Sequence, residues 1–168
     1  MLYKIFKLIF SKKIFAKPKQ FDLVIIDEAQ QKIFDDYLKD YNHFFIDIRL
    51  NKINLYVLFK TIFKFKFRAN FYLYICEYIK FSNCKTIISF FDNYVSYLRL
   101  KQKFPLIRFI FIQNGMRTSF FFENLKKYSD LKVDYLLTFN DFYSQKFQEV
   151  IRGKFISIGS FKNNQIQN

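Results

Sequence analysis

Short apolar runs that each end in a polar cluster recur six times along this chain. A parallel strand is buried on both faces, so it appears as a continuous run of Val, Ile, Leu and Phe rather than as an apolar/polar alternation. The six runs with their polar ends are residues 24–28, 44–49, 87–93, 109–117, 135–141 and 155–164. The pattern predicts an α/β fold with a mostly parallel sheet of about six strands. Ligands of such sheets bind outside the carboxyl ends of the strands, so function is expected at the polar clusters.

The segments between the runs favour helices, which makes the order Rossmann-like with right-handed crossovers. Helices are predicted at residues 28–39, 54–67, 69–81, 94–103 and 141–151, with 54–67 and 69–81 forming either one long helix or two. Asp92 and Asn93 are predicted to cap the fourth of these helices, because both side chains accept hydrogen bonds from a first helical turn.

Basic residues outnumber acidic ones by 28 to 14 among 168 residues, which gives a net charge of +14. This surplus favours an anionic partner, which is nucleic acid, an acidic membrane surface or a phosphorylated small molecule. The codon bias of an AT-rich genome would explain part of the excess lysine. Residues 1–19 are predicted to form a basic amphipathic segment, either a helix on an anionic membrane or a helix packed on the domain. No apolar stretch reaches the length of a transmembrane helix.

Several classes of site are excluded by what the chain lacks. Cys76 and Cys84 have no metal-binding spacing, and His43 is the only histidine, so no metal site is predicted. With three glycines in the chain, the dinucleotide-binding and Walker phosphate motifs are both absent. No cofactor is therefore expected.

The strongest local motif is Gln113-Asn114-Gly115-Met116-Arg117. Gly115 is predicted to turn the backbone with a positive φ and to expose amide N–H groups, while Arg117 offers a planar fork for phosphate or carboxylate. The motif suits a sugar hydroxyl or a phosphate, and it equally suits an ordinary turn after a strand.

Carboxylates at other strand ends are candidates for a general base that activates an acceptor hydroxyl. Asp27, Glu28 and Asp92 lead because they flank the central strands, and most of the other carboxylates are expected to cap helices.

A family resemblance is carried by IISFFDNYVSYLRLKQKFPLIRFIFIQNGMR, by VDYLLTFND and by GKFISIGSFKNN. These stretches resemble the N-terminal half of a bacterial family of O-antigen or lipopolysaccharide surface-carbohydrate biosynthesis proteins, and the resemblance covers nearly the whole chain. Such proteins look like two-domain GT-B glycosyltransferases or their polysaccharide-polymerising relatives. The resemblance implies a nucleotide-sugar donor, a glycan acceptor and no essential metal. It implies substrate contacts from Asn93, Gln113, Asn114, Gly115, Arg117, Ser160, Lys162 and Asn163.

The chain departs from this family at two places. It stops after IGSFKNN, where the family continues into a donor-binding domain, and residues 28–30 lack the expected glycine turn. We therefore expect a basic N-terminal segment at 1–19, a Rossmann-like domain at 20–162, and a truncated linker toward a second domain at 163–168. The expected function is an acceptor-side glycosyltransferase domain, truncated or split and inactive alone, in the cytoplasm at the inner face of the inner membrane.

Two other functions stay open at this point. A basic nucleic-acid-binding module would use the positive charge and the 23% aromatic residues. Against it, most aromatic residues lie in apolar runs and no RNA- or DNA-binding motif is present. The third possibility is an inert remnant without activity.

Overall fold

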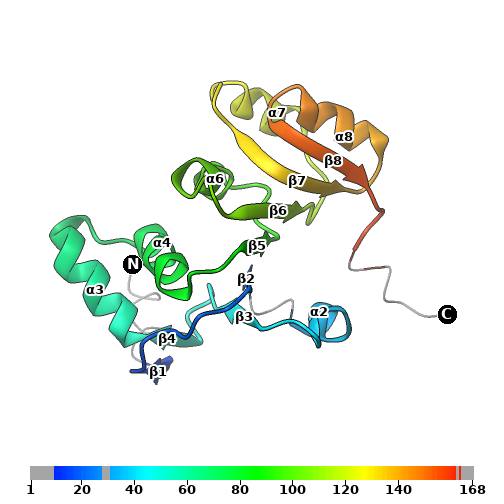
Figure 1. Ribbon diagram of the computed structural model, residues 1–168. Helices are drawn as coiled ribbons and strands as arrows, with labels where there is room; N and C mark the ends of the chain where they lie inside the picture. The colour runs from blue at the N-terminus through cyan, green and yellow to red at the C-terminus, as the bar shows by residue number, and fades with distance from the viewer. Residues whose placement is uncertain (1–9, 28–30, 162, 164–168) are drawn as a thin grey trace. The chain divides into compact units, whose positions relative to one another are not determined.

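The computed structural model describes residues 10–27, 31–161 and 163, except for the side chains of residues 35, 36 and 67. It divides into two compact units, Met1–Cys84 (unit 1) and Lys85–Asn168 (unit 2) (Figure 1). Among the described residues, unit 1 contributes one pair and unit 2 contributes four of the six main parallel strands, and unit 1 also has a second, separate parallel pair. The predicted Rossmann-like fold class with about six parallel strands is confirmed.

Unit 1 contains two parallel strand pairs and a pair of long helices. Its elements are β1 (Lys12–Ile14), β2 (Leu23–Ile26), α2 (Gln31–Leu38), β3 (His43–Ile46), β4 (Lys52–Asn54), α3 (Leu55–Phe65), η2 (Lys66–Arg68) and α4 (Phe71–Ser82). β2 pairs with β3, and β1 pairs with β4. All four residues of β2 are buried, as a strand covered on both faces requires.

Strand β1 was not predicted, because residues 1–19 were expected to be helical. In the described part of this segment, the backbone N–H of Lys12 donates to the carbonyl of Asn51 at 2.7 Å. The pairing partner lies far along the chain, so the local amphipathic pattern gave no sign of it. Residues 1–9 lie outside the described residues.

Helices α3 and α4 begin at asparagine caps and lie side by side (Figure 1). Asn54 accepts from the N–H of Val57 at 3.1 Å, and Asn70 accepts from the N–H of Leu73 at 3.0 Å. Helix α3 ends at Phe65, and the following residue, Lys66, has a φ of 50° and begins the 3₁₀ turn η2. The helical prediction for this region is confirmed, with a break between two helices.

Unit 2 is a four-stranded parallel sheet with the order β5-β6-β7-β8. Its elements are β5 (Thr86–Ser89), α5 (Val95–Leu98), α6 (Leu100–Lys103), β6 (Arg108–Ile112), α7 (Ser119–Leu125), β7 (Lys132–Thr138), α8 (Asp141–Gln148) and β8 (Arg152–Ser157). Helix α8 packs on β7 and β8 (Figure 1), and the rings of Phe122 in α7 and Phe147 in α8 lie 5.2 Å apart. The core of this unit is therefore aromatic.

Among the described residues, no helix combines the length and apolar character that crossing a bilayer requires. Over the same residues, no group of three or more His, Cys, Asp or Glu side chains has the arrangement of a metal site.

Candidate functional site

Polar residues meet at the carboxyl ends of β5, β6 and β7 in unit 2. Asp92 follows β5 and the 113–117 loop follows β6, and because the strands are parallel these ends share one edge of the sheet. The backbone N–H of Asn114 donates to Asp92 Oδ1 at 3.3 Å. The N–H of Phe139, just after β7, donates to Gln113 Oε1 at 2.9 Å. The structure thus brings together the predicted residues of two strand ends.

Asp92 and Arg117 form a bidentate ion pair at the centre of this cluster. Arg117 Nε donates to Asp92 Oδ2 at 2.8 Å, and Nη2 donates to Oδ1 at 2.5 Å. The Asp92 side chain is fully buried and that of Arg117 is 12% exposed. Burial raises the pKa of Asp92, and the Arg117 guanidinium opposes that rise. Two of the donors on the Arg117 fork are therefore occupied by a carboxylate of the chain itself.

This ion pair replaces the helix cap that was predicted at Asp92 and Asn93. Helix α5 begins after Tyr94, whose side chain makes no capping hydrogen bond. Both Asp92 oxygens instead accept from Arg117, and Asn93 is exposed. The capping prediction was wrong because a guanidinium competes better than a backbone amide for a buried carboxylate.

Gln113 and Gly115 hold the loop in shape. The Gln113 side chain is buried and donates from Nε2 to the Gly115 carbonyl at 3.0 Å. The predicted positive φ at Gly115 is wrong: the glycine with a positive φ is Gly159, at 76°. A Cβ on Gly115 would lie 3.3 Å from Arg117 Nη1, which is a close contact.

The segment after β8 returns toward the end of β5. The ring of Phe161 packs 6.1 Å from that of Phe90, and the N–H of Asn163 donates to the Ser160 carbonyl at 2.9 Å. Asn163 is exposed, whereas Lys162 lies outside the described residues. The roles predicted for Ser160, Lys162 and Asn163 stay predictions.

Asp27 lies at the end of β2 in unit 1 and has a φ of 109°, which side chains rarely adopt. It is buried, and Arg49 Nε lies 3.6 Å from its Oδ1. Strained residues of this kind cluster at functional sites. Asp27 therefore stays a candidate base, while Glu28 and the rest of the 28–30 segment, where the glycine turn was expected, lie outside the described residues.

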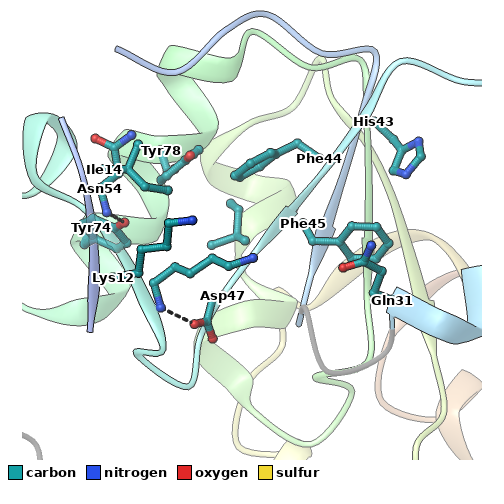
Figure 2. Close-up of a pocket in the computed structure, with 12 residues that line it drawn as sticks. Lys12, Ile14, Gln31, His43, Phe44, Phe45, Asp47, Asn54, Tyr74 and Tyr78 are labelled. Carbon is teal, nitrogen blue, oxygen red and sulfur yellow. Dashed lines mark hydrogen bonds between the residues drawn. The ribbon is translucent and has the colours of Figure 1, made fainter. Parts of the chain in front are cut away.

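A cavity of about 360 Å³ in unit 1 was not predicted from the sequence (Figure 2). Its lining residues are Lys12, Ile14, Gln31, His43, Phe44, Phe45, Ile46, Asp47, Lys52, Asn54, Tyr74 and Tyr78. The pairing of β1 with β4 places Lys12 beside Lys52. The local sequence pattern did not predict this pairing.

These features define an α/β protein of the Rossmann-like class with a polar cluster at the carboxyl edge of its sheet. A family model described as "putative O-antigen biosynthesis protein" matches residues 110–168. The searches of curated proteins and of solved structures found no match. The matched segment begins within β6 and includes the 113–117 loop, so the C-terminal third of the chain is similar to proteins associated with O-antigen biosynthesis.

Proposed function

We propose that this chain is the acceptor-side domain of a surface-polysaccharide glycosyltransferase of O-antigen or lipopolysaccharide biosynthesis. The observation that carries the proposal is the position of the family match, which contains the loop that follows β6 at the carboxyl edge of the sheet. In a GT-B-like enzyme, a second Rossmann-like half would bind the nucleotide of the sugar donor. This chain would then contribute the glycan-acceptor side and would need that half for transfer.

Within this proposal, the residues of the loop have different tasks. Asn114 is exposed, so its amide can donate to and accept from sugar hydroxyls. Arg117 positions the loop, because it holds the carboxylate that also accepts from the N–H of Asn114. Asp27 is the candidate base of unit 1.

Binding measurements on the intact chain test this proposal. Saturation-transfer NMR with short bacterial O-antigen oligosaccharides should show binding, and nucleotide sugars should show none. Asn114→Ala should weaken the oligosaccharide signal about tenfold while the fold is kept, because an acceptor-contacting amide is lost. Asn124→Ala, the same chemical change on α7, is the matched control. Binding of nucleotide sugars without any binding of glycans would contradict an acceptor-side role.

We also propose that the protein associates with an anionic membrane surface, on the cytoplasmic face of the inner membrane. Helix α3 exposes Phe59, Ile62 and Phe63 to solvent, and Phe63 is 79% exposed. Exposed basic side chains at Lys60, Lys66 and Arg68 accompany them. Large apolar side chains flanked by cations are typical of elements that lie in the headgroup region of acidic bilayers. This charge pattern supports a peripheral membrane partner.

A further inference from the structure

A second cavity of unit 1, of about 340 Å³, is formed by helix α3, the start of helix α4 and the segment 48–53. Its volume falls within the range of small-molecule sites. Every residue of its lining is uncharged, and most are aliphatic or aromatic. The lining residues are Ile48, Leu50, Ile53, Leu58, Thr61, Ile62, Ala69, Asn70, Phe71 and Tyr74.

The polar side chains of this lining are already engaged within the protein. Thr61 Oγ1 donates to the carbonyl of Val57 at 2.8 Å, and the hydroxyl of Tyr74 accepts from the N–H of Asn54 at 3.0 Å. Asn70 caps α4. A polar ligand group would lose its water here without gaining a side-chain partner, which costs free energy. An alkyl chain has no polar group to desolvate, so the lining side chains favour a hydrocarbon.

The cavity adjoins the exposed apolar face of helix α3. Ile62 lines the cavity and is also 44% exposed. The exposed residues Phe59 and Phe63 lie three positions before and one position after it, so the three side chains occupy neighbouring positions on one side of the helix. The surface that we propose to contact the membrane is therefore continuous with the cavity.

Cations lie on the turn between the two helices of the cavity. Lys66 and Arg68 belong to η2, which connects lining residue Ile62 to lining residue Ala69, and both of these basic side chains are exposed. Lys66 has a φ of 50° and a ψ of −129°, a conformation that favours glycine, and strained residues of this kind occur at ligand clamps. An ammonium and a guanidinium group at this turn suit the phosphate of an anionic lipid.

We propose that this cavity takes up one acyl chain of an anionic phospholipid, whose phosphate contacts Lys66 and Arg68. The inference deepens the proposed membrane association and rests on it, because the bilayer is the source of the lipid. Each methylene that enters the cavity leaves contact with water or with the bilayer interface and adds to the hold of α3 on the membrane. The charged headgroup stays outside, because every residue of the lining is uncharged.

Isothermal titration of the intact chain with soluble, monomeric lipids tests the cavity without a bilayer. Dihexanoylphosphatidylglycerol, below its micelle concentration, should bind saturably, and glycerophosphoglycerol, which has the headgroup and no acyl chain, should not bind. Ala69→Leu should weaken binding of the lipid about tenfold, because the larger side chain fills part of the cavity. Ala69 has a φ of −58° and a ψ of 128°, which leucine also adopts, so the fold should be kept. Ala16→Leu, the same change at an exposed site outside the lining, is the matched control.

A second variant tests the headgroup contact at an exposed position where folding is not at risk. Arg68→Gln should weaken binding of dihexanoylphosphatidylglycerol about fivefold, because one cation near the phosphate is lost. Arg108→Gln removes the same charge from an exposed site of unit 2 and should leave the affinity nearly unchanged. Dihexanoylphosphatidylcholine, whose headgroup has no net charge, should bind more weakly than the phosphatidylglycerol.

Each contrary result overturns a defined part of the inference. Equal weakening by Ala69→Leu and Ala16→Leu would remove the acyl chain from this cavity, and equal affinity for the two lipids would remove the anionic headgroup. Absence of saturable lipid binding, with a cooperative thermal transition retained, would overturn the site, and a dimer that Ala69→Leu dissociates would then assign the cavity to a second copy of this chain. Binding of the monomeric lipid without binding to vesicles would support the cavity and contradict only the membrane association.

Discussion

Arg117 is the residue on which the polar cluster of unit 2 depends. Its replacement by alanine leaves the fully buried carboxylate of Asp92 without its partner. We therefore expect Arg117→Ala to lower the free energy of unfolding by about 3–5 kcal/mol, the usual cost of breaking a buried pair from one side. Arg117→Lys should be intermediate, because it keeps the charge and loses the fork. Urea denaturation measures both changes.

Arg99→Ala is the control for this prediction, because Arg99 pairs with Asp130 at 3.2 Å while the two side chains are 41% and 49% exposed. Its effect should be much smaller. An Arg117→Ala variant that loses no more stability than Arg99→Ala would contradict the structural role assigned to the ion pair.

At the level of single residues, the sequence revealed which polar groups occupy the strand ends but not how they pair. Asp92 and Arg117 were both picked out, yet their pairing depends on two parallel strand ends that meet only in the folded chain. Gly115 was explained by a positive φ that it does not adopt, and a Cβ at this position would meet Arg117 Nη1 at 3.3 Å, which is a close contact with the end of a side chain. A local sequence pattern predicts where a residue lies in a strand, helix or loop. The side chain's role also depends on which distant residues contact it in the folded chain, and the pattern does not show these.

Helices α3 and α4 are joined by an ionic cluster that should make stability depend on pH. Burial raises the pKa of Glu77 in α4, but hydrogen bonds from Lys64 at 2.9 Å and Lys80 at 3.1 Å outweigh it and leave the pKa lowered. A carboxyl with a lowered folded-state pKa stabilises the protein above its unfolded-state pKa, and this contribution is lost as pH falls through the folded-state pKa.

We expect Glu77→Gln to remove about 0.5–1 kcal/mol of stability at neutral pH and to flatten the pH dependence below about pH 4.3. The measurement is the free energy of unfolding in urea between about pH 6 and pH 3. Glu123→Gln, in the exposed pair with Lys126 on α7, is the control and should leave the profile nearly unchanged. A Glu77→Gln profile parallel to that of the native chain would refute the cluster's contribution.

At the level of elements, strands with continuous apolar runs were predictable and short polar strands were not. Strands β2, β5 and β6 overlap their predicted runs, and each begins one residue before its run, because burial on both faces demands apolar residues along most of a strand. β1 contains two lysines and one isoleucine, and its strand conformation is fixed by pairing with β4 rather than by its own composition. The cavity shown in Figure 2 was not predicted because residues of β1 and β4 line it and their pairing was not predicted.

On the scale of the whole molecule, a net charge of +14 attracts any polyanion. Binding to acidic vesicles alone would therefore not show which part of the protein contacts the membrane. We expect the chain to bind vesicles of phosphatidylglycerol and phosphatidylcholine, with an affinity that falls as salt is added. Phe63→Ala should weaken binding about tenfold at unchanged charge, because the apolar contact of a phenyl ring with the bilayer is lost. Co-sedimentation measures this.

Phe120→Ala is the matched control, because Phe120 of unit 2 is 75% exposed and Phe63 of α3 is 79% exposed. It tests whether vesicle binding depends on the α3 surface or on any exposed phenylalanine. The Phe120 variant should bind acidic vesicles as tightly as the native chain. Equal losses for both variants would remove α3 from the membrane contact. Salt-sensitive binding of single-stranded oligonucleotides that also depends on exposed aromatic rings would favour the nucleic-acid function instead. The net positive charge therefore attracts the chain to any anionic surface. The effects of Phe63→Ala and Phe120→Ala distinguish a membrane contact through α3 from binding by charge alone.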